Sequence, residues 1–236
     1  MSRNFFSFKK VFIKREKMKL IDIQQNYNTI FSLGNSCLTA IKLRQFKLRP
    51  YAGIIDWMLS PNLLAINNLL KNRCENFMEK ETMVCDGYNT LIYGHLLLRD
   101  LLYDVTSVHD FSIIENTITD WNTYKNFKIK IKKRIQRFLN KLETCNRILF
   151  VRIGGTYEEA KLLEQTLTQI VTHEFRLLII NEEFIDWIIE YNWNLQYTCG
   201  IGISIDKRES DELWDVILKN IMCTEISDDF IDIIDD

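Results

Sequence analysis

One cysteine stands where a thiol could act as a nucleophile. The stretch FSLGNSCLTAIKLRQF, residues 31–46, predicts the end of a buried strand, a turn at Gly34 and a helix with Cys37 in its first turn. A helix N-terminus offers free N–H donors and partial positive charge, which lower the pKa of a thiol and favour the reactive thiolate. We therefore interpret Cys37 either as a nucleophile or as a structural residue, which buried cysteines often are.

A cysteine nucleophile needs a base, which is usually a histidine. The chain has three histidines. His109 ends a strand predicted over residues 103–109, where a side chain can reach a neighbouring loop. His95 lies in an apolar segment and fits a core position, and His173 fits a solvated position between a helix and a strand. The candidate pair is therefore Cys37 and His109.

Two acids could orient the imidazole of His109. Asp110 adjoins it but faces away unless the backbone turns there. Asp56 lies in the loop GIIDWM after the cysteine helix, where it could equally cap the next helix. Beside the nucleophile, the Asn35 amide and the backbone N–H of Ser36 could hold an oxyanion.

Arg152 ends a strand predicted over residues 147–153, at the edge where open α/β sheets bind ligands. Its guanidinium could clamp a substrate carboxylate or phosphate, or form an ion pair. With the turn Gly154-Gly155, it also raises the hypothesis of a nucleotide or sugar-phosphate ligand. The chain lacks CxxC spacing and a GxxxxGK[ST] loop, so we expect no metal and no cofactor.

Five segments carry a resemblance to a known family. FSLGNSC, GIIDWM, VHDF, KIKKRIQRF and ILFVR follow one another in this order. The series, over about residues 28–155, resembles an uncharacterised family of papain-like cysteine peptidases. Members of that family show Ser-Leu-Gly-x-x-Cys, Pro-Phe-Asp-Trp, His-Asp-Phe and a basic Arg-Arg-x-x-Arg-Phe helix.

The family motifs map onto this chain position by position. The matching residues are Ser32, Leu33, Gly34 and Cys37; Asp56 and Trp57; His109, Asp110 and Phe111; and Arg134, Arg137 and Phe138. Ile54-Ile55 stands where the family has Pro-Phe, and Lys133 stands where it has its first Arg. The resemblance implies a thiol hydrolase acting on a peptide or small acyl substrate, with Cys37 as nucleophile and His109 as base.

Strands and helices alternate along the chain. The predicted strands are 28–33, 103–109, 147–153, 175–180 and 195–205, and the predicted helices are 36–46, 62–79, 124–142, 157–171, 183–191 and 211–222. This alternation favours an α/β fold with a largely parallel or mixed central sheet and helices on both faces. A papain-like fold would instead set a long nucleophile helix against an antiparallel barrel. We take the fold from the alternation and the site from the resemblance.

Composition fits one globular domain. The chain has 236 residues, 47% of them apolar, and a net charge of −2. We expect a basic, flexible extension over residues 1–18, a single domain over 19–223 and an acidic tail over 224–236. The charge balance does not favour a nucleic-acid partner, and no apolar run is long enough for a membrane span. Cysteines without a disulfide-scaffold pattern, and a start without a signal-peptide core, favour a cytoplasmic location.

A basic stretch supports an alternative function. Residues 125–147 carry nine Lys or Arg residues against one acid, Glu143. The chain could therefore be a catalytically inactive binding or effector module that uses this helix as its surface. A solvated helix face explains the same charges without any partner.

Overall fold

The core of the protein is a five-stranded mixed sheet. The computed structural model describes residues 17–90 and 93–225. The sheet has the order β2-β7-β8-β10-β9, in which the first four strands are parallel and the last is antiparallel. Its strands are β2 (Thr29–Ser32), β7 (Arg147–Ile153), β8 (Glu174–Glu183), β10 (Thr198–Ser204) and β9 (Ile188–Glu190).

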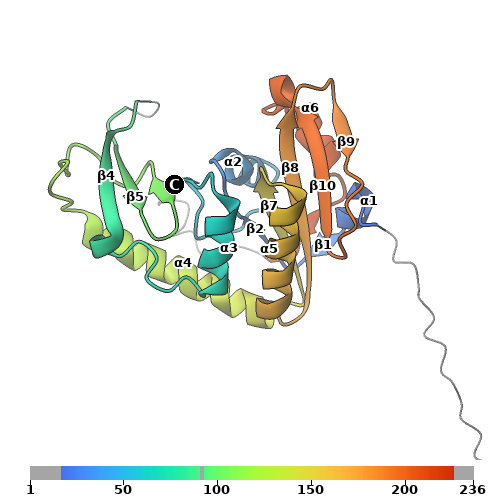
Figure 1. Cartoon of the computed structure of the whole chain (residues 1–236), viewed down its shortest axis with the longest axis horizontal. Coiled ribbons are helices and arrows are strands. Elements are labelled where there is room, and N and C mark those ends of the chain that lie inside the picture. Colours follow the sequence, from blue (N-terminus) through green and yellow to red (C-terminus); the bar gives the residue numbers. More distant parts are fainter. Residues whose placement is uncertain (1–16, 91–92, 226–236) are drawn as a thin grey trace, which may run out of the picture.

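Helices cover both faces of this sheet (Figure 1). One face packs against α1 (Leu20–Ile23), α2 (Leu38–Gln45) and α6 (Asp211–Ile217). The other packs against α3 (Leu63–Lys71), α4 (Tyr124–Thr144) and α5 (Tyr157–Ile170). Strands β7 and β8 are buried on both sides because their apolar runs have no polar alternation. The predicted α/β class is confirmed.

A second, antiparallel sheet lies beside α4 (Figure 1). Its order is β3-β6-β5-β4, and it shares the core that contains α3 and α4. The strands are β3 (Met58–Leu59), β6 (Val105–Ser107), β5 (Leu96–Asp100) and β4 (Met83–Tyr88). Most of this sheet was not predicted, because β4 has an irregularity between Cys85 and Gly87 and β5 begins as three leucines. Neither strand gives a clean period of two.

Three helix predictions are wrong in part or in whole. The helix predicted over 211–222 ends at Ile217, and Met222 instead pairs with Asn26 as part of a strand. The helix predicted over 183–191 is a turn followed by β9, which pairs with β10. Gly202 lies opposite Ile189 in this pairing, and a Cβ on Gly202 would lie 2.9 Å from the Ile189 side chain, so the glycine leaves room for β9. The helix predicted over 62–79 ends at Lys71, and left-handed residues follow, beginning with Arg73.

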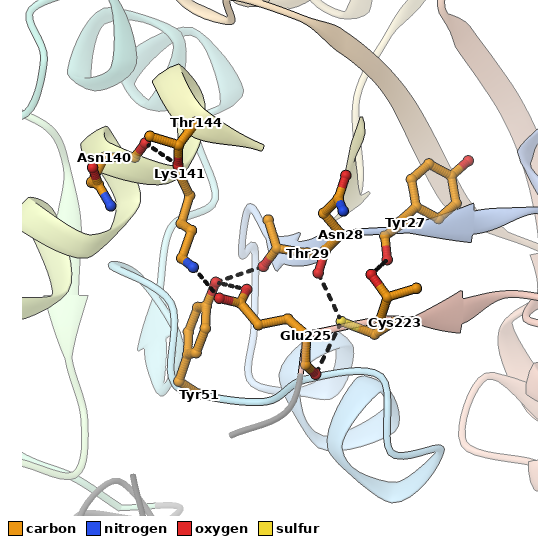
Figure 2. A network of polar contacts seen from close by, with 10 residues as sticks. Tyr27, Asn28, Thr29, Tyr51, Asn140, Lys141, Thr144, Cys223 and Glu225 are labelled. Atoms are coloured by element: carbon orange, nitrogen blue, oxygen red, sulfur yellow. Dashed lines mark hydrogen bonds and ion pairs between the residues drawn. The ribbon is translucent and has the colours of Figure 1, made fainter. Parts of the chain in front are cut away.

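The last described residues dock onto the rest of the domain (Figure 2). β11 (Met222–Cys223) pairs in parallel with β1 (Asn26–Tyr27). The Glu225 carboxylate then accepts a hydrogen bond from the Tyr51 hydroxyl at 2.7 Å and pairs with Lys141 of α4. Apart from residues 17–18 and 224–225, the predicted basic extension and acidic tail lie outside the described residues.

Candidate active site

Cys37 and His109 lie together although they come from different sheets. Cys37 is the residue before α2, on the chain that leaves β2 of the parallel sheet. His109 follows β6 of the antiparallel sheet by two residues. The Sγ of Cys37 lies 3.7 Å from Nε2 of His109. The structure therefore brings the predicted pair to a distance at which a proton can pass between them.

A tight turn positions Cys37 near His109. Gly34 and Asn35 both have left-handed backbones, with φ of 78° and 80°. The Asn35 N–H donates to Ser60 Oγ, and the Ser60 N–H donates back to the Asn35 carbonyl, each at 2.9 Å. A Cβ on Gly34 would lie only 2.3 Å from Ser60 Oγ. Only glycine fits this position, so the sequence motif Leu-Gly-x-x-Cys has a steric cause.

Arg152 supports this turn from within the core. Its guanidinium donates to the carbonyls of Leu33 and Ser60, each at 2.7 Å, and to Ser60 Oγ at 3.2 Å. The side chain is fully buried, and burial lowers its pKa to about 10. The expected substrate clamp is therefore not seen, because the guanidinium has no exposed surface. No local pattern indicates this role of Ser60, because its partners Asn35 and Arg152 lie far from it along the chain.

The thiol of Cys37 is in an environment opposite to the expected one. Burial, together with the nearby Asp56 carboxylate, raises the pKa of Cys37 to about 11, and only its own backbone N–H opposes this. The expectation that the helix start lowers this pKa is wrong, because desolvation and a negative neighbour outweigh the partial charge of a short helix. The resting group at neutral pH is a thiol.

His109 is held in its neutral form. Burial lowers the pKa of its imidazole below the ordinary 6.5, and the charge of Asp110 partly opposes this effect. The neighbouring His95 lowers the pKa of His109 further, since two cations side by side repel one another. At neutral pH the pair is thus an uncharged thiol beside an uncharged imidazole, which can accept a proton.

Asp110 does not hydrogen-bond to the imidazole among the described contacts. Its carboxylate accepts from Ser107 Oγ at 2.6 Å and pairs with Lys130 of α4, also at 2.6 Å. Asp110 therefore influences His109 through its charge rather than through a hydrogen bond.

Asp56 is buried in a different set of contacts. Its carboxylate pairs with Arg49 at 2.9 Å and accepts the Gly53 N–H at 2.8 Å. Burial raises the pKa of Asp56, and the charges of Arg49 and Arg134 lower it. Neither of these contacts reaches His109, so the two acids considered for orienting the imidazole are both bound to other groups.

The predicted oxyanion donors are placed unequally. The Asn35 backbone N–H is already used by Ser60, and the Asn35 side-chain nitrogen would lie 3.0 Å from a Cβ on Gly154. The Ser36 hydroxyl accepts the Leu38 N–H at 3.4 Å. The backbone N–H of Cys37 faces its own thiol, since it stabilises the thiolate.

A cavity of about 440 Å³ opens beside Asn35, at the carboxyl ends of β7 and β8. Three acids, Glu159, Glu182 and Glu183, line it together with Gly154 and Gly155. The first turn of α5 is capped by its own residues, Thr156 and Glu159. The phosphate ligand considered from the sequence is disfavoured here, because the cavity wall is acidic and the N-terminus of α5 is already capped by its own side chains.

Most cations of the basic stretch 125–147 interact with other groups of the same domain. Lys130 pairs with Asp110 and the charge of Arg134 acts on the buried Asp56. The other engaged cations are Lys128 with Glu79, Arg137 over the Tyr51 ring, Lys141 with Glu225 and Arg147 with Glu174. Lys125, Lys132 and Lys133 are left exposed. The surface proposed for an effector module is therefore small.

Two further searches cover the described parts of the chain, residues 17–90 and 93–225. In these ranges no group of three or more His, Cys, Asp or Glu side chains could hold a metal ion. No helix within them is both long and apolar enough to cross a membrane.

Fold and site together define a mixed α/β protein with a thiol–imidazole pair between its two sheets. The profile of the family described as "Putative papain-like cysteine peptidase (DUF1796)" matches residues 28–183, which include both Cys37 and His109. The chain belongs to this family. It is also 24% identical over 160 residues to "Uncharacterized protein R408" of Acanthamoeba polyphaga mimivirus, covering 61% of this chain and 69% of that protein. No solved structure gives a significant match.

Proposed function

We propose that the protein is a thiol hydrolase of the papain-like peptidase type, with Cys37 as nucleophile and His109 as general base. The observation that carries this proposal is the 3.7 Å approach of Sγ and Nε2, both within the residues that the family profile matches. Packing alone does not require a cysteine and a histidine at these two positions, which come from separate sheets. A peptide or a small acyl compound is the proposed substrate, and cysteine usage favours a cytoplasmic site of action.

The neutral pair determines the order of proton movements. Nε2 of His109 takes the thiol proton of Cys37 as the sulfur attacks the substrate carbonyl carbon. The backbone N–H of Cys37 donates to the developing oxyanion. His109 then gives the proton to the leaving nitrogen or oxygen, and a thioester remains on Cys37.

Water completes the cycle. His109, neutral again, takes a proton from a water molecule whose oxygen attacks the thioester carbonyl. Collapse of the tetrahedral intermediate breaks the C–S bond and releases the carboxylic acid. The proton on His109 returns to sulfur, so both residues end in their starting state.

An activity-dependent probe tests this proposal. A peptidyl acyloxymethyl ketone should label Cys37 of the intact protein, as read by mass spectrometry, and labelling should be lost in Cys37→Ala and strongly reduced in His109→Ala. Cys85→Ala is the matched control, because Cys85 is another partly buried free thiol. Labelling that is unchanged in His109→Ala, or that is equal at Cys85 and Cys37, would overturn the proposal.

A further inference from the structure

Trp57 has a backbone conformation that large side chains rarely adopt. Its φ is 66°, in the left-handed region, although Trp57 is neither glycine nor asparagine. Outliers of this kind persist where the surrounding structure holds them, and they concentrate at functional sites. Specific contacts should therefore stabilise this conformation of Trp57, and the conformation should serve the site.

Buried charges and strand pairing hold Trp57 in place. Asp56, with a side chain only 1% exposed, is bound by Arg49 and by the Gly53 N–H. The same Arg49 guanidinium lies 5.2 Å from the centre of the Trp57 ring. On the other side of Trp57, β3 pairs with β6, with Met58 opposite Ser107. Trp57 is thus fixed between a buried ion pair and the strand that leads to His109.

The Trp57 ring makes an edge contact with the base. Its centre lies 5.8 Å from the centre of the His109 imidazole, with the planes at 83°. His95 lies on the imidazole as well, at 6.3 Å and 62°. Neither Asp110 nor Asp56 shows a hydrogen bond to this ring among the described contacts. Aromatic neighbours are therefore the contacts seen on the imidazole besides Cys37.

We propose that Trp57 is a positioning residue that holds the His109 imidazole with Nε2 toward Cys37, and that Asp56 and Arg49 act through Trp57. This inference rests on the proposed function and deepens it. It also gives the Asp-Trp motif a physical role, because the acid anchors the loop and the tryptophan carries the contact to the base.

The test compares three substitutions at Trp57 with one elsewhere. Trp57→Ala and Trp57→Leu remove the edge contact, whereas Trp57→Phe keeps an aromatic edge. Trp121→Ala is the matched control, because Trp121 is also partly buried but packs near Lys80. The first readout is acyloxymethyl ketone labelling of Cys37. We expect a loss of about tenfold or more in the Ala and Leu variants, near wild-type labelling in Phe and no change in the control.

The second readout does not depend on reactivity. NMR titration of the His109 ring should show its pKa moving up toward 6.5 in Trp57→Ala or Trp57→Leu, because a lost aromatic wall admits water. Trp57→Phe should keep the depressed value. If Trp57→Ala does not fold, the comparison of Leu with Phe carries the test.

Two results would overturn the inference. One is a wild-type His109 titration with wild-type labelling in the variants without an aromatic ring; the other is an equal loss in Phe and Leu. Failure of the proposed function looks different, because labelling would then be insensitive to His109→Ala while the His109 titration still responds to Trp57.

Discussion

The Sγ of Cys37 lies 3.7 Å from Nε2 of His109, although 72 residues separate them along the chain. Burial acts on both groups in the direction that removes charge, because it raises the pKa of the thiol and lowers that of the imidazole. The pair is therefore a neutral couple rather than a preformed thiolate and imidazolium, so in the proposed mechanism the proton moves as the sulfur attacks.

The first prediction concerns simple alkylation of Cys37. Because the pKa of this thiol is raised to about 11, little thiolate is present at pH 7. The rate with iodoacetamide should rise about tenfold per pH unit and level off only near pH 11, since the thiolate is the reacting species. Mass spectrometry of the Cys37 peptide measures the rate, with free cysteine as the reference. A plateau already reached at pH 8 would contradict the neutral pair.

Lys130 is expected to tune the base from the helix behind it. Its ammonium pairs with Asp110 at 2.6 Å, and the charge of Asp110 raises the pKa of His109. Lys130→Gln leaves this negative charge unbalanced, so the pKa of His109 should rise. Labelling is lost as pH falls through this pKa, because a protonated imidazole accepts no proton.

The acid limb of the labelling profile should therefore move to higher pH in Lys130→Gln. Lys133→Gln, at an exposed position on the same helix, should leave the limb where it is in the wild type. A Lys130→Gln limb that stays in place or moves to lower pH would show that Asp110 does not act on His109 through its charge.

Arg152 should matter for stability. Arg152→Met removes hydrogen bonds to Leu33 and Ser60 and leaves buried carbonyls without a partner. The free energy of unfolding in urea should fall by about 2–4 kcal/mol, because buried groups that lose a charged partner pay their desolvation cost. Arg147→Met on the same strand breaks only an exposed pair with Glu174, so it should cost about 1 kcal/mol or less. Equal losses in the two variants would contradict this role.

Gly34 should tolerate no side chain. Gly34→Ala forces a Cβ to within 2.3 Å of Ser60 Oγ at a left-handed φ of 78°. Backbone strain of this kind costs about 1–3 kcal/mol, and the clash adds to it. Gly87→Ala has a positive φ of 108° but meets nothing within 4 Å, so it isolates the backbone effect. Thermal unfolding and Cys37 labelling should both suffer more in Gly34→Ala; a larger loss in Gly87→Ala would refute the clash.

Local sequence patterns were sufficient to predict those helices and strands whose formation depends on a single stretch of the chain. Strand β7 occupies residues 147–153 as predicted, and α4 begins at the predicted Tyr124, because apolar runs and three- to four-residue periodicity are local signals. In the antiparallel sheet only β6 fell within a predicted strand, because β4 is irregular and β3 has only two residues, whose strand form depends on pairing with β6.

The candidate site shows the same distinction between local sequence signals and tertiary contacts. The sequence by itself selected Cys37 and His109 as the proposed nucleophile and base, since few Cys–His combinations exist and one carries both motifs. It also placed a turn at Gly34, whereas the contact with Ser60 that excludes a side chain there is tertiary. The tertiary structure alone decided that Arg152 is buried under the turn, that Asp110 pairs with Lys130, and that Trp57 contacts His109. It also decided the direction of the Cys37 pKa, because desolvation and the charge of Asp56 depend on which segments the fold brings around the thiol.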